Sequence, residues 1–492
     1  MKTLSPSRSA RRVPLAACLC LALCIPAEVA SAGVLDHIPG RLLADAWRAN
    51  PGGRPGAARA RIAREAIGSS RPATTLPVTS CADDGSDGTL RAVVASAATG
   101  DIVDMSQLTC GTITLTTGQI NIYVDNLTLQ GPGQTALTID ANHASRAIAG
   151  YGRGLAINDL TVANGYQTGP GYGGCVYSYL YQPDNPTTLA RVTVDGCTAV
   201  ASGGASFAVG GGVLAFGSLT LESSTLSNNT ATGPDGTQIL GGGAYVAYGF
   251  DITNSTITGN RAVRSAPGSN RFALGGGIDA SIRDSQSALT GSTLSDNTAD
   301  DFGGALFLYV ASIGGSTISM HVANSTVSGN TSGSGTGIEI DSGPNAPFYL
   351  ALDNSTVAFN AFTRDTGCGG LAQAGYTSSV VDLESTILAG NTGPGGAEYD
   401  ACASQDTSSL TGANNLRVVS ELPVPPGTLS DDPMLGPLQD NGGPTRTHAL
   451  LPGSPAIDNG NNVAALDFDQ RGAGFAREVG ARADIGAFEV QA

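Results

Sequence analysis

The sequence predicts an all-β protein built as a parallel β-helix, a solenoid whose coils have about 30 residues. A short phrase ending in asparagine recurs at intervals of 31, 37, 33, 30 and 31 residues, as "SSTLSNN", "NSTITGN", "GSTLSDN", "NSTVSGN", "NSTVAFN" and "ESTILAGN". A glycine-rich phrase recurs in phase with it, as "GGGV", "GGGA", "GGGI" and "GGAL". Between the phrases lie β-branched stretches such as "SLTLESSTL", which lack helical periodicity. One period is long enough for about three short strands and three turns.

The first 32 residues have the features of a secretory signal. Basic residues precede the apolar run "VPLAACLCLALCI", and the small-residue site "ASA" ends at Ala32. The apolar run is too short to cross a bilayer as a helix of the mature protein. We therefore expect the mature chain to begin at Gly33 and to be exported, to the extracellular space or the outer cell surface.

Three segments flank or form the solenoid. Residues 33–77 are rich in Arg, Ala, Gly and Pro, which predicts a flexible linker or pro-segment. Residues 78–110 predict a cap with an amphipathic helix that would close the open end of the core. The apolar face of this helix consists of Leu90, Val93, Val94 and Ala97. We expect the parallel β-helix over residues 111–415 and a β-rich C-terminal module over residues 416–492.

The repeated phrases are typical of a scaffold. Equivalent residues of successive coils stack at the strand spacing of ~4.8 Å. Glycine is needed where the chain bends with a positive φ. An asparagine at a fixed corner can hydrogen-bond the next coil, and serine and threonine hydroxyls can form ladders. The phrases therefore predict the fold and do not by themselves predict a reaction.

The charge of the chain excludes some partners. The formal net charge is −16 at pH 7, and Lys2 is the only lysine. An acidic surface repels phosphate backbones and anionic membranes. We therefore expect no nucleic-acid partner, and no membrane span in the mature chain.

Six of the nine cysteines lie after the signal segment, and an even number in an exported protein predicts disulfides. They occur as neighbours along the chain and predict the pairs Cys81–Cys110, Cys175–Cys197 and Cys368–Cys402. Cys197 occupies the position that other coils give to asparagine. This favours a bridge from one coil to the next.

The chain also resembles known families of surface proteins. The alternation of glycine-rich phrases with phrases ending in asparagine, over residues 173–391, resembles the polymorphic outer membrane protein repeat. The segment "CADDGSDGTLRAVVASAATGDIVDM" resembles the leader of secreted right-handed parallel β-helices. The end of the chain, "LLPGSPAIDNG…DQRG…DIGAFE", resembles the choice-of-anchor Q domain of bacterial surface proteins. These resemblances imply a right-handed β-helix at the bacterial outer membrane or cell surface, and they do not imply a reaction.

Few residues suggest catalysis or metal binding. The four histidines are scattered, and neither a Ser/His/Asp order nor HExxH occurs. The residues that carry the choice-of-anchor Q resemblance are expected to form ion pairs and turn caps: Asp458, Asp469, Arg471 and Asp484. The segment Asp83–Gly88, "DDGSDG", is expected to form a turn and a helix cap. A calcium site there is the alternative, and no other cofactor is expected.

One pattern goes beyond the scaffold. The apolar residue that closes each glycine-rich phrase, and the residue two places later, should face inward, as Val176/Ser178 and Leu306/Leu308 do. The alternate positions should then face outward. They are Tyr177/Tyr179, Leu214/Phe216, Tyr245/Ala247, Asp279/Ser281, Phe307/Tyr309 and Glu339/Asp341.

Two interpretations of these outward positions stay open. Neighbouring loops would bury the rings, or the rings and carboxylates would form a surface that binds a polysaccharide or a cell-surface partner. The ligand-binding candidates under the second interpretation are Tyr177, Tyr179, Phe216, Tyr245, Phe307 and Tyr309. An adhesin or envelope role would follow. The alternative function is cleavage by a polysaccharide lyase or an inverting hydrolase, with Asp279, Glu339 and Asp341 as candidates. Asp279 and Glu339 would lie two coils apart, about 9–10 Å.

Overall fold

The structure, a computed structural model, describes residues 72–491 except 181, 183–184, 267, 269–271, 284–285, 312–317, 345, 378 and 404–407. The predicted signal segment, residues 1–32, and most of the predicted linker, residues 33–77, lie outside the described residues. The first strand, β1 (Thr75–Pro77), lies in the last residues of that linker and pairs with β2 (Ile102–Asp104). The first strand therefore lies just before the predicted cap.

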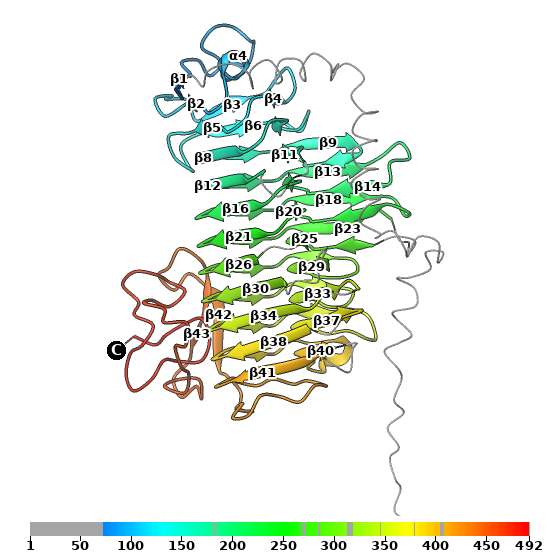
Figure 1. Ribbon diagram of the computed structural model, residues 1–492, viewed down its shortest axis with the longest axis vertical. Coiled ribbons are helices and arrows are strands. Elements are labelled where there is room, and N and C mark those ends of the chain that lie inside the picture. Colours follow the sequence, from blue (N-terminus) through cyan, green and yellow to red (C-terminus); the bar gives the residue numbers. More distant parts are fainter. Residues whose placement is uncertain are drawn as a thin grey trace, which may run out of the picture. The chain divides into compact units, whose positions relative to one another are not determined.

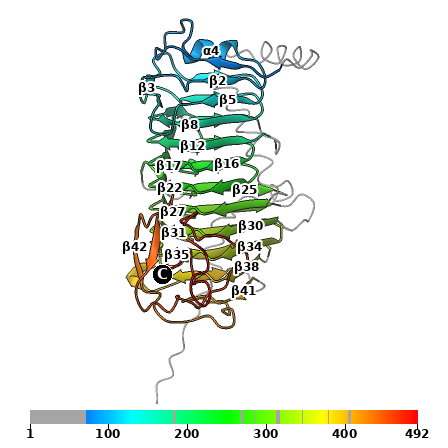
Figure 2. The same cartoon turned by 90° about the vertical axis from the view of Figure 1, so that its left-hand side faces the viewer.

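The described chain is a right-handed parallel β-helix, as predicted. Figures 1 and 2 show its strands stacked coil upon coil, and every pair between successive coils is parallel. The largest sheet, sheet A, has 20 strands. They are β1, β2, β3 (Thr112–Thr114), β5 (Leu127–Gln130), β6 (Thr138–Asp140), β8 (Leu155–Ala163), β12 (Thr187–Asp195), β16 (Leu219–Glu222), β17 (Thr225–Ser227), β21 (Phe250–Thr253), β22 (Thr256–Thr258), β26 (Gln286–Thr290), β27 (Thr293–Ser295), β30 (Ile318–Ala323), β31 (Thr326–Ser328), β34 (Phe348–Asp353), β35 (Thr356–Ala358), β38 (Ser379–Glu384), β39 (Ile387–Ala389) and β41 (Ser409–Ala413).

The second long sheet, sheet C, has ten strands and faces sheet A across the core. They are β4 (Ile120–Ile122), β7 (Ile148–Gly150), β11 (Val176–Ser178), β15 (Val213–Ala215), β20 (Ala244–Val246), β25 (Ile278–Arg283), β29 (Leu306–Ala311), β33 (Ile338–Ser342), β37 (Leu371–Gly375) and β40 (Ala401–Ala403). The predicted inward residues are buried and belong to one core, among them Val176, Val213, Ile278, Leu306 and Ile338. The inward alternation predicted from the glycine-rich phrases is confirmed.

Two smaller sheets make several coils longer than the three-strand coil expected from the sequence. Sheet D contains β9 (Tyr166–Gly169), β13 (Thr198–Ala201), β18 (Thr230–Gly233), β23 (Arg261–Arg264), β28 (Thr298–Ala299), β32 (Thr331–Ser332) and β36 (Ala361–Phe362). Sheet E contains β10 (Gly171–Tyr172), β14 (Phe207–Val209), β19 (Gln238–Leu240) and β24 (Ala273–Leu274). A separate small core, rich in alanine, lies between them and includes Ala208, Ala231, Ile239 and Ala262. Sheets D and E can pack closely because the side chains between them are small.

The ends of the solenoid are covered differently. The predicted cap helix is α4 (Leu90–Ser96); the Thr89 side chain accepts a hydrogen bond from the Ala92 N–H at its start, and Leu90 and Val94 are buried. A short 3-10 turn, η1 (Pro394–Gly396), lies between β39 and β40 near the C-terminal end of the solenoid. The C-terminal module contains one antiparallel pair, β42 (Leu435–Gln439) and β43 (Thr447–Leu450), and otherwise turns. No helix in the described ranges has the length and apolar character needed to cross a membrane.

The repeated asparagines form a buried ladder along the solenoid. Each side-chain amide donates to the next asparagine, for example Asn229 Nδ2 to Asn260 Oδ1 at 2.9 Å and Asn330 Nδ2 to Asn360 Oδ1 at 2.8 Å. The ladder begins where the Cys197 N–H donates to Asn229, and it ends where Asn391 Nδ2 donates to the Asp400 carboxylate at 2.8 Å. The predicted role of the phrase as scaffold is confirmed.

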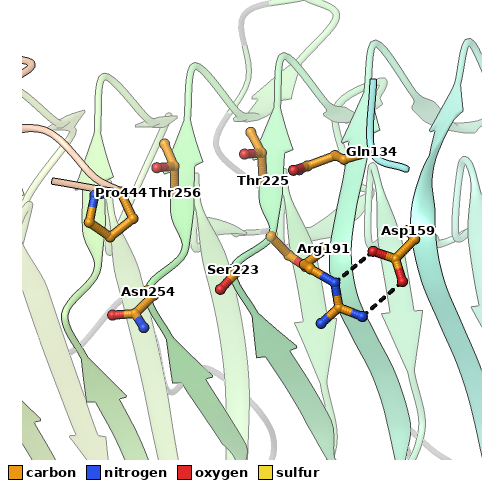
Figure 3. Close-up of a pocket in the computed structure, with 9 residues that line it drawn as sticks. Gln134, Asp159, Arg191, Ser223, Thr225, Asn254, Thr256 and Pro444 are labelled. Atoms are coloured by element: carbon orange, nitrogen blue, oxygen red, sulfur yellow. Dashed lines mark hydrogen bonds and ion pairs between the residues drawn. The ribbon is translucent and has the colours of Figure 1, made fainter. Parts of the chain in front are cut away.

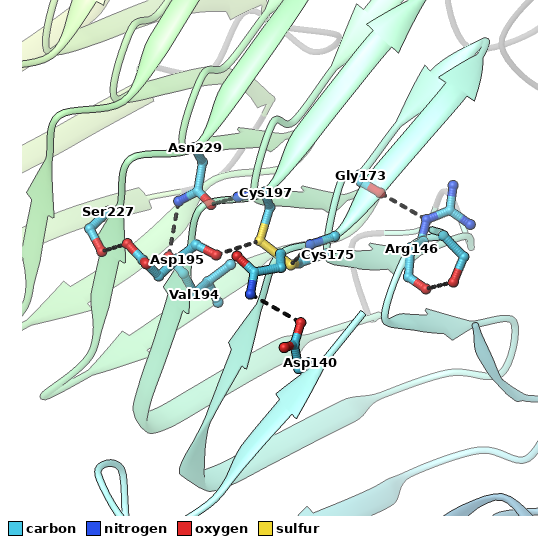
Figure 4. The surroundings of a disulfide bond; sticks show 12 residues. Asp140, Arg146, Gly173, Cys175, Val194, Asp195, Cys197, Ser227 and Asn229 are labelled. Carbon is cyan, nitrogen blue, oxygen red and sulfur yellow. Dashed lines mark hydrogen bonds between the residues drawn. A yellow bond between two sulfur atoms is a disulfide. The ribbon is translucent and has the colours of Figure 1, made fainter. Parts of the chain in front are cut away.

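The three predicted disulfides are confirmed: Cys81–Cys110, Cys175–Cys197 and Cys368–Cys402. Figure 4 shows the Cys175–Cys197 bridge between the glycine bend of one coil and the asparagine corner of the next, beside Asn229. Both of its cysteines are fully buried.

Candidate functional site

The outward residues of sheet C form two rows along successive coils, and the residues of the first row pair in register. The first row contains Tyr177, Leu214, Tyr245, Asp279, Phe307 and Glu339. All six residues are buried, and their exposed fractions are at most 6%. The interpretation of Tyr177, Tyr245 and Phe307 as exposed binding residues is therefore wrong, and the interpretation of buried rings is correct for this row.

The glycine-rich phrase itself covers this row. Each row residue follows, four positions later, a glycine whose φ lies between 60° and 66°, such as Gly173, Gly303 and Gly335. A Cβ atom on Gly303 would lie 2.6 Å from Phe307 Cβ, and one on Gly335 would lie 2.5 Å from Glu339 Cδ. The bend therefore folds the backbone over the outward side chain. Only glycine allows this approach and this φ.

The second row is more open at some positions. It contains Ser281, Tyr309 and Asp341, which pair in register, and Tyr179, Phe216 and Ala247, each of which directly follows a strand of sheet C. Phe216 is buried, whereas Tyr179, Tyr309 and Asp341 keep part of their surface exposed. Tyr151 packs against Tyr179 and stacks on Tyr123, with ring centroids 5.8 and 5.1 Å apart. Of the six predicted binding aromatics, Tyr179 and Tyr309 thus remain candidates.

The three predicted catalytic carboxyl groups lie in an unusual environment. Burial raises the pKa of Asp279 to about 8 and that of Asp341 to about 6, and it raises the pKa of Glu339 well above its usual range. Asp279 Oδ2 and Glu339 Oε2 are buried and have no hydrogen-bond partner among the described residues. Asp279 and Glu339 lie two strands apart with Phe307 between them, as expected. Asp279 and Glu339 are too deeply buried to present a carboxyl group to a polymeric substrate, and Asp341 alone is partly exposed.

A groove on the outer face of sheet A is the larger of the two open sites that we consider. We call it the tyrosine groove; it has a volume of about 580 Å³ and is lined by Phe250, Asp251, Gln286, Ser287, Ala288, Ser319, Met320, His321, Tyr349 and Ala351. His321 pairs in register with Ala288 on one side and Ala351 on the other. Small side chains beside a large one leave the hollow that the groove occupies.

Polar groups with fixed partners surround the groove. His321 Nε2 lies 2.6 Å from Asp353 Oδ2, and this hydrogen bond raises the pKa of the imidazole, which favours its protonated form. Tyr349 Oη donates to Asp382 Oδ2 at 2.9 Å, and Thr411 donates to the other carboxylate oxygen at 2.6 Å. Burial and the bonded Asp382 raise the pKa of Tyr349 to about 12. The rings are thus held in place, yet the Tyr349 side chain remains 37% exposed.

The sequence contains a signal for this groove in two alternating stretches. The stretches "ISMHVA" and "FYLALD" alternate, so that His321 and Tyr349 face away from the core while Met320 and Leu350 face into it. His321 lies near Asp353, and Tyr349 near Asp382, because of the register between neighbouring coils. This register cannot be derived from the sequence, because the connecting loops differ in length.

A second, smaller groove of about 340 Å³ lies farther along the same sheet. We call it the threonine groove; Figure 3 shows Thr225 and Thr256 between Gln134 and Pro444, with the Asp159–Arg191 ion pair beside them. Arg191 holds Asp159 through two hydrogen bonds, of 2.6 and 2.8 Å. Asp251 of the tyrosine groove and Asn254 of the threonine groove belong to the same coil, so the two grooves adjoin.

The other predicted polar residues have structural partners. Asp83 is bonded to Arg91 and to the backbone N–H groups of Thr116 and Thr117, and Asp84 accepts from Ser86. Across the ranges that the structure describes, no group of three or more His, Cys, Asp or Glu residues is arranged to hold a metal ion. Calcium at this turn therefore stays without support.

The predicted polar residues of the C-terminal module have hydrogen-bond partners; Asp469, Arg471 and Asp484 are buried, and Asp458 is exposed. Asp469 and Arg471 form an ion pair of 2.6 Å, and Asp484 accepts from the backbone of Asp458 and Val490. Asp458 accepts from the Ala481 N–H at 2.9 Å. These contacts match the ion pairs and turn caps expected for Asp458, Asp469, Arg471 and Asp484.

Comparisons with known proteins add little beyond the fold. No family model and no curated protein matches the sequence. Among solved structures, pectate lyase Pel9A matches with a TM-score of 0.43 and 14% identity, over 87% of this chain and 98% of that one. A PL6 alginate lyase in complex with a trisaccharide matches with a TM-score of 0.28 and 10% identity, over 79% and 93% of the two chains. Likeness at this level carries no argument about activity, so the function must be judged from the grooves.

Proposed function

We propose that the protein is an exported β-helix that binds an uncharged linear glycan in the tyrosine groove, as an adhesin or envelope component. The observation that carries this proposal is an open groove across four successive coils in which the half-exposed Tyr349 ring lies near a protonatable imidazole and several carboxylates. Sugar rings stack on aromatic faces through their C–H groups, and carboxylates accept hydrogen bonds from sugar hydroxyls. A linear glycan matches a site that extends along stacked strands.

Charge selects the kind of glycan. Asp251 lines the groove, and Asp353 and Asp382 lie beside His321 and Tyr349. Together with a formal net charge of −16, these groups repel a chain of uronic acids. An uncharged glycan avoids this repulsion and can still use the His321 ring. Nδ1 of that ring makes no hydrogen bond to any described residue and is free to donate to a sugar oxygen when the ring is protonated.

Binding without cleavage agrees with the acid–base state of the groove. Elimination needs a base, and a pKa of about 12 keeps the Tyr349 hydroxyl protonated, while Asp353 favours the protonated form of His321. Cleavage by Asp279, Glu339 and Asp341, the alternative predicted from the sequence, would need two acidic groups at the surface, whereas Asp279 and Glu339 are buried and only Asp341 is partly exposed. We therefore propose a binding function rather than a lyase or hydrolase.

Export is part of the proposal. The three disulfides suit an oxidising compartment, and the predicted signal in residues 1–32 would direct the chain there. The resemblances to polymorphic outer membrane protein repeats and to choice-of-anchor Q domains support a location at the bacterial cell surface.

A glycan array probed with the mature protein tests this function. We expect binding to neutral oligosaccharides and none to polyuronates. Tyr349→Ala should weaken binding about fivefold or more, because an aromatic contact of ~1 kcal/mol or more is lost. Tyr166→Ala is the matched control, since Tyr166 is 38% exposed on sheet D, away from the groove. Equal binding by the Tyr349 variant and wild type, or release of shortened products, would contradict the proposal.

A further inference from the structure

The threonine groove interrupts a row of paired hydroxyl groups. A row of nine threonines pairs in register across successive coils of sheet A, and it begins with Thr112 and Thr138. The seven that follow are Thr161, Thr193, Thr225, Thr256, Thr293, Thr326 and Thr356. Five of them make hydrogen bonds to segments that lie over the sheet. The hydroxyls of Thr225 and Thr256 make none to any described residue, and both side chains line the groove.

The segments over the neighbouring threonines show what this row binds. The single side-chain amide of Gln470 spans two coils: Thr326 Oγ1 donates to Gln470 Oε1 at 2.6 Å, and Gln470 Nε2 donates to Thr293 Oγ1 at 2.8 Å. On the other side of the groove, Gln134 also spans two coils, because its backbone oxygen accepts from Thr161 at 2.7 Å and its Nε2 donates to Thr193 at 2.9 Å. Thr225 and Thr256 lie between these two bridged pairs and are likewise paired on neighbouring strands. No amide of a described residue bridges them.

The lining of the groove fits an amide that carries a methyl group. The Pro444 side chain lies at one end and offers an apolar surface. Asn254, Ser223 and the Asp159–Arg191 pair surround the remainder with polar groups that suit hydroxyls. An amide whose oxygen accepts from one threonine and whose N–H donates to the other would complete the row, as Gln470 does two coils farther on.

From this geometry we infer that the threonine groove binds the acetamido group of an N-acetylated sugar. This inference rests on the proposed glycan binding and specifies its ligand class. The two grooves share a coil, at Asp251 and Asn254, so one chain of sugars can reach from the Tyr349 ring to the threonine pair. A neutral N-acetylated glycan also satisfies the charge argument for the tyrosine groove.

A matched pair of oligosaccharides tests the inference. Tri- to hexamers of N-acetylglucosamine and of glucose differ only in the acetamido or hydroxyl group at C2, and calorimetric titration measures both. We expect the N-acetylated hexamer to bind about fivefold to tenfold more tightly than the glucose hexamer, as one or two hydrogen bonds would give. Thr225→Val and Thr256→Val, which keep side-chain shape, should abolish this preference for the N-acetylated hexamer. Thr230→Val, on sheet D, is the control.

The outcomes separate the inference from the proposed function. Equal affinity of wild type for the two hexamers, with Tyr349→Ala still weakening both, would overturn the acetamido site and leave glycan binding intact. Absence of binding to every oligosaccharide would overturn both. Tighter binding of a glutamine-containing peptide such as acetyl-Gln-amide, lost in Thr225→Val, would assign the groove to a polypeptide partner and also overturn the inference. Thermal unfolding confirms that each valine variant is folded.

Discussion

Asp279 should make the protein less stable as pH rises, and Asp279→Asn should remove that effect. Burial raises the pKa of Asp279 to about 8 in the folded protein, whereas an unfolded aspartate titrates near 3.9. Between these two pH values the folded protein holds a proton that the unfolded chain has lost. The free energy of unfolding therefore falls by about 1.4 kcal/mol for each pH unit gained. Over the whole interval the loss is on the order of 5 kcal/mol.

This dependence of the unfolding free energy on pH is opposite to that of ordinary acid denaturation, in which stability falls as pH falls. The stabilising contribution is fully present below pH 4 and is lost as pH rises through 8. Burial also raises the pKa of Asp341 and Asp400, to about 6 and about 7, so these groups act in the same direction. Wild type should consequently be more stable at pH 5 than at pH 8.

Denaturant unfolding at pH 5, 6, 7 and 8 measures the effect. The slope of unfolding free energy against pH should be shallower in Asp279→Asn by about one proton, ~1.4 kcal/mol per pH unit. Burial of the introduced asparagine amide lowers the unfolding free energy by the same amount at every pH, so it does not change the slope. Asp365→Asn, an exposed position, should keep the wild-type slope. An unchanged slope in Asp279→Asn would refute the burial of a neutral carboxyl group at this site.

Other predictions concern the scaffold. Asn330→Ala should cost about 2–4 kcal/mol in urea unfolding because it leaves buried donors of Asn297 unpaired, whereas exposed Asn121→Ala should cost about 0.5 kcal/mol or less. Cys175→Ser should cost about 2–4 kcal/mol and leave a thiol that a mass tag detects after unfolding; peptide mapping that links Cys175 to Cys368 in wild type would contradict the coil register. Leu308→Ala should cost about 2–5 kcal/mol in the same assay, and a loss under 1 kcal/mol would contradict its place in the core.

The sequence was sufficient for features that depend on the repeat. The asparagine ladder, the inward row of Val176 and Leu306, the cap helix and the three disulfides all follow from spacing along the chain. The ladder and the inward row rest on equivalent positions of neighbouring coils, which the repeat identifies directly. The cap helix follows from the spacing of its apolar residues, and the disulfides follow from pairing cysteines that are neighbours along the chain.

The sites depended on information that the repeat does not contain. The outward alternation was right for Tyr177 and Phe307, but glycine bends in the same coil cover these rings. The pairing of Thr326 with Gln470 joins residues 144 apart through a module that is not repetitive. Neither fact can be derived from a pattern with a period near 31 residues, because both depend on how segments pack over the outer surface.

The asparagine ladder has a direction. Every link runs the same way, from a side-chain N–H of one coil to the side-chain oxygen of the next, so the amide dipoles add rather than cancel. A stack of this kind needs a donor at its start and a pure acceptor at its end, and the backbone N–H of Cys197 and the carboxylate of Asp400 supply them. Whole internal coils can therefore be inserted or removed as modules without leaving an unmatched amide. Truncation before Asp400 would instead leave the side-chain N–H of Asn391 without its acceptor, so a carboxyl oxygen of Asp400 ends the ladder.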